Sequence, residues 1–162
     1  MTDTLQKYAI LGLASGCFLS YVPAWLLRRR RYTGAGLVGS LWGVALLSWL
    51  PLDPARAAAV WVGLLAIGVV AGDLAEEFLG KDDPRIVIDE WIGLWAALLF
   101  QPRTPAVIVS AFVLFRILDV YKPGWIRRAA GLPGGWGVVM DDVLAGVAAN
   151  GLVYLGRVII SI

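Results

Sequence analysis

Long apolar runs separated by short polar connections make up almost the whole chain. A helix that spans a membrane needs about 20 mainly apolar residues, and fewer where its ends lie at the interface. The pattern therefore predicts six spanning helices, over residues 8–27, 34–52, 57–75, 86–100, 104–121 and 138–161. Proline or glycine lies in every connection except the first, RRRRYT, as expected where helices end.

Composition places the chain in the membrane class. Of its 162 residues, 59% are hydrophobic and 16% are charged, whereas soluble domains have about 45–50% apolar and about 25% charged residues. We expect an all-α fold, a polytopic helical bundle that forms one membrane-embedded domain over residues 1–162 with a polar site at its cytoplasmic end. The net charge of +2 is too small to suggest a nucleic-acid partner.

The basic residues orient this bundle, because Lys and Arg collect in cytoplasmic loops. If the six helices alternate in direction, the face where the second helix begins carries ten basic residues and the other face carries four. The ten are Arg28, Arg29, Arg30, Arg31, Lys81, Arg85, Arg116, Lys122, Arg127 and Arg128, and the four are Lys7, Arg56, Arg103 and Arg157. This excess predicts that the first face is cytoplasmic and that both termini lie outside.

The residue types that the chain lacks exclude several kinds of site. There is no histidine, which removes His-ligated zinc and Ser-His-Asp catalysis. The single cysteine, Cys17, rules out a disulfide within the chain. Any acid, base or metal ligand must therefore be a carboxylate, lysine, tyrosine, serine or backbone group.

Two pairs of adjacent acids interrupt the apolar runs. Asp89 and Glu90 lie in IVIDEWIGLW, and Asp141 and Asp142 follow a glycine-rich loop in GGWGVVMDDVLAG. One acid at a helix start is explained by the helix dipole, but ionisable residues inside a span are costly and usually mark a site. The alternation of the helices places both pairs on the cytoplasmic face. Four neighbouring carboxylates need a counter-ion, and a site of oxygen ligands alone suits Mg²⁺.

A third polar motif, FRILDVYKPGWI, supplies positive charge on the same face. Arg116, Asp119 and Lys122 lie at helical spacing. They form either an ion pair with a snorkelling lysine or a clamp for phosphate oxygens. In GLVGSLWG, Gly39 and Ser40 lie near a helix start whose N–H groups could bind an anion, although close helix packing is the ordinary reason for such glycines.

The three motifs IVIDEWIG, FRILDVYKP and GGWGVVMDDVLAG, in this order and spacing, closely resemble those of the phosphatidylglycerophosphatase A family over roughly residues 34–160. The resemblance implies Mg²⁺-dependent removal of the terminal phosphate of phosphatidylglycerophosphate, giving phosphatidylglycerol, in the bacterial inner membrane. We therefore expect catalytic roles for Asp89, Glu90, Asp119 and Asp142. The expected metal ligands are Asp89, Glu90, Asp141 and Asp142, and the expected phosphate-binding residues are Gly39, Ser40, Arg116 and Lys122.

Two positions depart from the family pattern. Ala35-Gly36-Leu37 stands where the family has Pro-Gly-Thr, and Gly124-Trp125 stands where the family has a second proline after the lysine-proline pair. A different class also stays open, since ion- or proton-coupled transporters place acids and arginines inside spans. The expected partners are the phospholipid substrate and the bilayer, and the sequence leaves open whether the chain forms a homo-oligomer.

Overall fold

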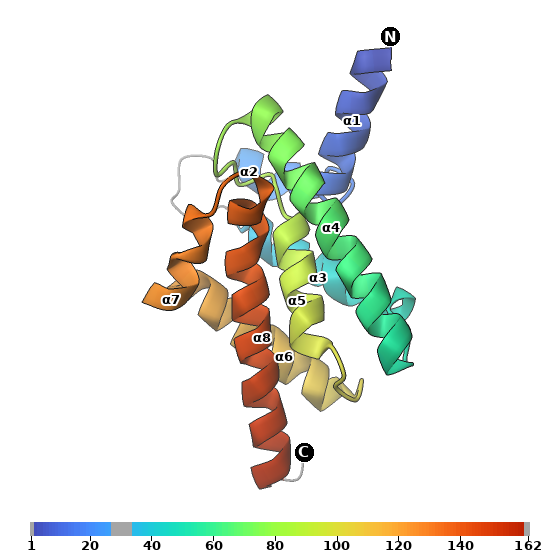
Figure 1. Cartoon of the computed structure of the whole chain (residues 1–162), viewed down its shortest axis with the longest axis vertical. Coiled ribbons are helices and arrows are strands. Elements are labelled where there is room, and N and C mark those ends of the chain that lie inside the picture. Colours follow the sequence, from blue (N-terminus) through green and yellow to red (C-terminus); the bar gives the residue numbers. More distant parts are fainter. Residues whose placement is uncertain (1, 27–33, 161–162) are drawn as a thin grey trace.

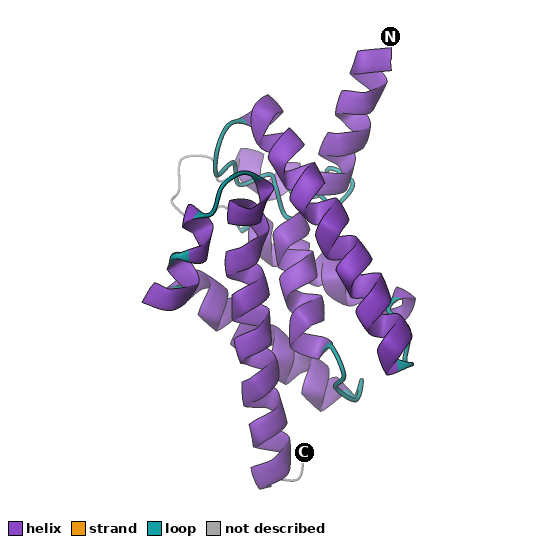
Figure 2. Ribbon diagram, in the orientation of Figure 1, coloured by secondary structure: helices purple, strands orange, loops and turns teal. Residues whose placement is uncertain are grey.

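The computed structural model describes residues 2–26 and 34–160, and every regular element in these ranges is a helix (Figure 1, Figure 2). The elements are α1 (Thr2–Ala14), α2 (Tyr21–Leu26), α3 (Ala35–Ala45), η1 (Leu47–Trp49), α4 (Pro54–Leu79), α5 (Ile88–Leu98), α6 (Pro105–Tyr121), α7 (Gly124–Arg127), η2 (Ala129–Gly131) and α8 (Gly135–Ile160). Helices α4 and α8 are long and apolar enough to cross a membrane. The arginine run 28–31 lies outside the described residues.

The helices α4 and α6 begin where the connections LDPAR and QPRT predict. The Asp53 side chain accepts the main-chain N–H of Arg56 at 2.9 Å, and the Thr104 hydroxyl accepts that of Val107 at 3.3 Å. In both helices a proline follows the capping residue. Such caps satisfy N–H groups that the first turn leaves free, and proline has no N–H to satisfy.

The first apolar run is not one continuous helix. Gly16, Cys17 and Phe18 have φ angles of 59°, 57° and 64°, so the chain leaves the right-handed helix after α1. Left-handed residues cannot continue an α-helix, and α2 starts only at Tyr21. The predicted spanning helix over residues 8–27 is therefore two short helices joined by a turn.

The second apolar run is also divided. Helix α3 ends at Ala45, and the chain continues as the single turn η1. The main-chain oxygens of Leu47 and Pro51 accept hydrogen bonds from Arg103, both at 2.9 Å, which ties this turn to the connection between α5 and α6. The six uninterrupted apolar helices that the sequence predicts are therefore not what the structure has.

The two ends of the described chain lie at opposite ends of the long axis (Figure 1). Helix α1 starts at the end where α4 finishes, and Nζ of Lys7 lies 5.1 Å from the ring centroid of Phe78 in α4. The prediction that both termini share one face is therefore wrong, as is the placement of Lys7 on the far face. The reason is the turn after α1, because α1 and α2 do not cross the bundle. From α3 onward the helices alternate in direction as predicted.

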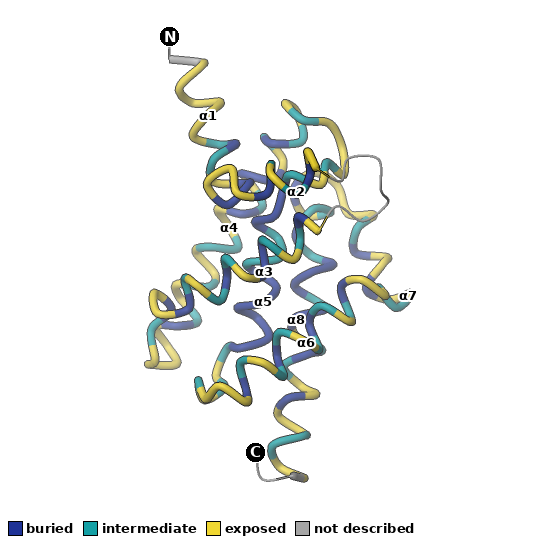
Figure 3. The backbone as a smooth tube through the Cα atoms, turned by 180° about the vertical axis from the view of Figure 1, so that it is seen from behind, coloured by how far each residue is buried: buried dark blue, intermediate teal, exposed yellow. Residues whose placement is uncertain are grey.

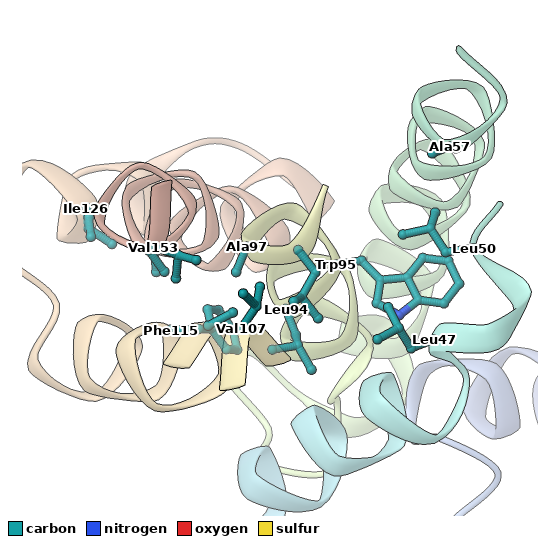
Figure 4. Packing of buried hydrophobic residues seen from close by; sticks show 14 residues of the cluster. Leu47, Leu50, Ala57, Leu94, Trp95, Ala97, Val107, Phe115, Ile126 and Val153 are labelled. Carbon is teal, nitrogen blue, oxygen red and sulfur yellow. The ribbon is translucent and has the colours of Figure 1, made fainter. Parts of the chain in front are cut away.

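Helix α5 lies at the centre of the bundle (Figure 3). Its side chains Ile92, Leu94 and Ala97 are each 0% exposed. Trp95 extends from α5 toward Leu47 (Figure 4), and its Nε1 donates to the main-chain O of Gly43 at 2.8 Å. The burial of α5 on all sides fixes the position of its first turn, which carries Asp89 and Glu90.

The loop before α5 is tied to the turn between α1 and α2. The Ser20 hydroxyl donates to the main-chain O of Arg85 at 2.6 Å, and the main-chain N–H of Val87 donates to Ala14 at 2.8 Å. Arg85 in turn holds Asp83 in an ion pair of 2.7 Å. These bonds explain how the N-terminal turn supports the start of α5.

The Asp83–Arg85 pair makes stability depend on pH in a predictable direction. Burial by itself raises the pKa of Asp83, but the hydrogen bonds and charge of Arg85 outweigh it, so the pKa lies below its ordinary value of 3.8. A carboxyl whose pKa is depressed in the folded state stabilises the fold above its unfolded pKa, and this contribution is lost as the pH falls through the folded pKa. Between about pH 6 and about pH 3, thermal unfolding in detergent should show a larger loss for the wild type than for Asp83→Asn. Parallel pH curves for the two proteins would contradict this assignment.

Candidate active site

Close packing of α5 against α8 brings the two acidic segments together. A Cβ on Gly93 would lie 2.6 Å from the main-chain O of Asp142, and a Cβ on Gly146 would collide with the main-chain O of Gly93. Backbones that approach so closely leave room only for glycine. Because the helices touch here, Asp89 and Glu90 at the start of α5 lie beside Asp142 near the start of α8.

Three carboxylates form a compact group at this crossing. Asp89, Glu90 and Asp142 each offer an oxygen, and these oxygens all lie within 4.8 Å of one another. Within the described residues, Oδ1 of Asp89, Oε2 of Glu90 and Oδ2 of Asp142 are buried without a hydrogen-bond partner. Such oxygens are costly to bury and repel one another. A hard divalent cation would supply the missing partner, so the three residues fit a Mg²⁺ ion.

Lys122 gives the acids a positive neighbour. Its Nζ donates to Oδ2 of Asp141 at 2.5 Å, and lies 3.3 Å from Oδ1 of Asp119 and 3.5 Å from Oδ1 of Asp142. The residue ends α6 with a left-handed φ of 44°, which non-glycine residues adopt only uncommonly. Its side chain thus joins the end of α6 to the acids of α8.

Arg116 lies one turn before Asp119 on the same face of α6. Its Nη1 donates to Oδ2 of Asp119 at 2.8 Å and to the hydroxyl of Ser40 at 3.3 Å. Ser40 is fully buried and donates to the main-chain O of Gly36 at 3.0 Å. The guanidinium is therefore held between α6 and α3 at the edge of the carboxylate group.

The beginning of α3 packs directly on Glu90 through its glycines. A Cβ on Gly36 would collide with Oε1 of Glu90 and would lie 3.2 Å from Nη1 of Arg116. A Cβ on Gly39 would lie 2.7 Å from Cβ of Val87. The start of α3 is thus a wall of the site, and only glycine leaves Glu90 its place.

Gly36→Ala should therefore impair activity more than stability. The added methyl group must push the Glu90 carboxylate out of the three-carboxylate group, and a displacement of about 1 Å at a reacting centre can cost on the order of 100-fold in rate. The matched control is Gly63→Ala in α4, where a Cβ meets nothing within 4 Å. Phosphate release and thermal unfolding, measured on both variants, check the prediction. Equal phosphate release from the two variants would show that Glu90 tolerates the displacement.

Two predicted acids lie beside the three-carboxylate group without joining it. Asp141, expected to bind metal, faces Lys122 through Oδ2 and accepts the main-chain N–H of Asp142 at 3.1 Å through Oδ1. Asp119, expected to act in catalysis, has one oxygen on Arg116 and the other near Lys122. Asp141 holds Lys122 in place, and Asp119 holds both Arg116 and Lys122. The direct roles of the two acids in metal binding or catalysis stay predictions.

Two of the four predicted phosphate-binding residues lie at the three-carboxylate group, and the other two lie in α3. Arg116 and Lys122 lie at the carboxylate group, where each pairs with Asp119 as the ion-pair interpretation predicts, and their role as a phosphate clamp stays a prediction. Gly39 is buried against Val87, which favours the packing interpretation of this glycine. Contact of Gly39 or Ser40 with phosphate stays a prediction.

Sequence reasoning missed the positioning roles of Gly36 and Gly93. The signals for Gly36 are its place beside the glycine-serine pair of GLVGSLWG and its match to the glycine of the family's Pro-Gly-Thr. Gly93 lies three residues after Glu90, where a glycine inside an apolar helix indicates a close helix contact. Neither signal identifies the partner of the glycine, which depends on how the helices cross.

Comparisons with known proteins agree with the geometry of the site. The family model described as phosphatidylglycerophosphatase A matches residues 13–157. A protein of Bacteroides thetaiotaomicron that carries the provisional name phosphatidylinositol-3-phosphatase is 38% identical over 133 residues, 79% of this chain and 84% of that protein. Phosphatidylglycerophosphatase A of Escherichia coli is 36% identical over 127 residues, 74% of this chain and 72% of the relative.

A third relative, phosphatidylglycerophosphatase A of Haemophilus influenzae, is 34% identical over 119 residues, which cover 72% of each chain. No solved structure matches the chain. All the residues of the carboxylate group lie inside the stretch that the family model matches.

Proposed function

Because the chain belongs to the phosphatidylglycerophosphatase A family of lipid phosphatases, we propose that it hydrolyses the terminal phosphomonoester of phosphatidylglycerophosphate to phosphatidylglycerol and phosphate. The observation that carries the proposal is the three-carboxylate group with its unpartnered buried oxygens. Arg116 and Lys122 lie next to it. Carboxylates that can hold a cation beside two fixed basic groups are the parts that phosphoryl transfer needs.

Asp89, Glu90 and Asp142 are the residues proposed to hold Mg²⁺. When bound, the ion would polarise the phosphoryl group and lower the pKa of a coordinated water. The proposal leaves Asp141 outside the first set of ligands, because its Oδ2 faces Lys122.

The chain's own cations bind and orient the phosphate. Arg116 and Lys122 would donate to the equatorial oxygens, where charge spreads as the ester bond breaks. Asp119 keeps both cations in position, since one of its oxygens lies 2.8 Å from Arg116 and the other 3.3 Å from Lys122. We propose that water attacks phosphorus directly, because no aspartate in the sequence lies in an Asp-x-Asp motif of the phosphoaspartate phosphatases.

The protein is membrane-associated, with two helices of spanning length and bacterial relatives in the same family. We propose a multi-pass position in the inner membrane with the carboxylate group toward the cytoplasm, as the excess of basic residues at that end favours. The outer face of α6 exposes Val113 and Ile117 next to Arg116. Acyl chains could lie along this apolar face while the phosphate reaches the basic groups.

A second candidate substrate is a phosphoinositide phosphorylated at the 3-position. It is favoured by the relative from Bacteroides thetaiotaomicron, whose name states this activity. Both substrates offer a phosphomonoester on a lipid headgroup, so the same residues would act on either. The transporter alternative gains no support from the comparisons.

Phosphate release from purified protein in detergent tests the proposal. With Mg²⁺, phosphatidylglycerophosphate should be hydrolysed faster than phosphatidylinositol 3-phosphate, and a chelator should stop the reaction. A preference for phosphatidylinositol 3-phosphate would favour the second candidate. The absence of phosphate release from either lipid would contradict the assignment as a lipid phosphatase, and full activity in chelator would contradict the metal site alone.

A further inference from the structure

A pocket that contains two arginines lies at the end of the bundle away from the carboxylate group. It is a cavity of about 520 Å³ between the start of α4, the 99–104 connection and the last turns of α8. The side chains of Gln101, Arg103 and Arg157 line it, and its other lining residues are apolar or proline. Among the described residues, no acidic side chain lines the cavity.

The two arginines of this pocket are partly buried cations that have no counter-ion among the described residues. Within residues 2–26 and 34–160, neither arginine makes an ion pair. Arg103 donates to main-chain oxygens, and burial lowers its pKa. Arg157 donates from Nη1 to Oε1 of Gln101 at 2.9 Å, while its Nε is buried without a partner in the described chain. Partly buried charges that stay unpaired are unfavourable.

A chain of hydrogen bonds holds Arg157 in this position. Gln101 donates to Oδ1 of Asn150 at 2.9 Å, and Asn150 donates to the main-chain oxygens of Ala96 and Leu99 at 2.9 and 2.8 Å. These bonds satisfy the main-chain O of Leu99 at the end of α5 and add a second donor to that of Ala96, which also accepts the N–H of Leu99. The guanidinium is therefore fixed by the fold and is not a loose surface side chain.

The surroundings of the pocket indicate an amphipathic ligand. Leu52 and Phe100, which line it, are 81% and 65% exposed, and nearby Trp49 is 74% exposed. Tryptophan in a membrane protein collects at the level of lipid headgroups, and exposed apolar side chains such as Leu52 and Phe100 suit contact with acyl chains. The nearest acid in sequence, Asp53, is occupied in capping α4.

We propose that this pocket binds the phosphodiester group of an anionic phospholipid in the leaflet opposite the carboxylate group. Arg103 and Arg157 would bind the phosphate oxygens, since guanidinium groups match phosphate geometry. The acyl chains would lie against the exposed apolar side chains of Leu52 and Phe100. The inference concerns a site separate from the proposed reaction, because this lipid has no phosphomonoester to lose.

Lipid retention tests the proposal on the full chain purified in detergent. Native mass spectrometry would count bound phosphatidylglycerol and bound phosphatidylcholine in the presence of a chelator, which keeps Mg²⁺ from the carboxylate group. The wild type should retain phosphatidylglycerol in preference to phosphatidylcholine. Arg157→Gln should retain about tenfold less, as expected for loss of a hydrogen bond to a charged group. The matched control is Arg128→Gln, an exposed arginine beyond α7, which should behave as the wild type.

The other possible results of this experiment either identify the ligand or overturn the proposal. Competition by millimolar inorganic phosphate would show that the pocket recognises phosphate itself, whereas retention that inorganic phosphate does not disturb would assign the site to the lipid. Equal retention by Arg157→Gln and Arg128→Gln, or equal binding of both lipids, would overturn the proposal. If Arg157→Gln does not fold, thermal unfolding of the wild type decides, since phosphatidylglycerol must stabilise it more than phosphatidylcholine does.

Discussion

Asp142→Asn is expected to abolish nearly all phosphate release while leaving the fold intact. A bound metal supplies several kcal/mol of transition-state stabilisation, and each 1.4 kcal/mol is a factor of ten in rate, so loss of one ligand should cost roughly 100-fold or more. Asparagine has almost the same shape as aspartate, so the crossing of α5 and α8 should be kept. Asp89→Asn and Glu90→Gln should behave in the same way. Initial rates with Mg²⁺ in detergent check all three variants.

Thermal unfolding in chelator gives these variants a second signature. Each of the three carboxylates has one unpartnered oxygen, so removing one negative charge should leave stability unchanged or raised, because a source of repulsion is gone. The matched control is Asp82→Asn, whose exposed side chain lies in the loop before α5 at a φ of 56°, a conformation that asparagine accepts. Near-normal rates in all three variants would refute the metal site. A large loss of stability in chelator would mean that the acids serve the fold.

Gly146→Ala is expected to disrupt the contact between α5 and α8 and, with it, the three-carboxylate group. A Cβ at this position would collide with the main-chain O of Gly93 and lie 2.9 Å from Cβ of Ala96. Backbone cannot give way as a flexible side chain can, so α8 must move away from α5. Overpacking of this kind costs about 1–3 kcal/mol, and the movement also separates Asp142 from Glu90. We expect a lower unfolding temperature and a loss of phosphate release together.

Gly151→Ala is the matched control, since it lies in the same helix and a Cβ there meets nothing within 4 Å. Both variants gain the same helix propensity from alanine, about 1 kcal/mol in water. Their difference therefore reports the close contact alone. Equal unfolding temperatures for the two variants would show that α5 and α8 do not cross at this glycine.

The acid motifs could be located from the sequence because charged residues inside apolar runs are rare. Asp89 and Asp142 lie 53 positions apart, yet each lies toward the start of a helix, α5 or α8, whose direction follows from counting the runs before it. To place two motifs on the same face or on opposite faces, it is enough to know whether the number of crossings between them is even or odd, which is their parity. This parity was correct from α3 onward, and the acids of α5 and α8 meet as expected.

The break in the first apolar run could not be predicted from the sequence. Hydropathy records how many apolar residues follow one another, but it does not record the handedness of the backbone. Of the three left-handed residues after α1, only Gly16 is a type that favours such a φ, whereas Cys17 and Phe18 give no warning. The turn depends on contacts with distant residues, such as Ser20 with Arg85.

The different contacts of the aspartates could not be predicted from the sequence either. Asp141 and Asp142 are neighbours of the same type, but their side chains point in different directions from α8. Asp141 meets Lys122 at 2.5 Å, while Asp142 faces Asp89 and Glu90. Which of the two aspartates meets Lys122 depends on the angle at which α6 and α8 cross. The spacing of residues in the sequence does not give this angle.

The opposite placement of the two chain ends decides where an attached protein can be tolerated. A fluorescent protein fused before Thr2 would emerge on the side of the carboxylate group, whereas one fused after α8 would emerge on the side of Arg157 (Figure 1). A bulky fusion at the C-terminus should therefore leave substrate access undisturbed. With the long axis across the bilayer, the two fusions would also fluoresce in different compartments, and tagged forms of this enzyme are not interchangeable.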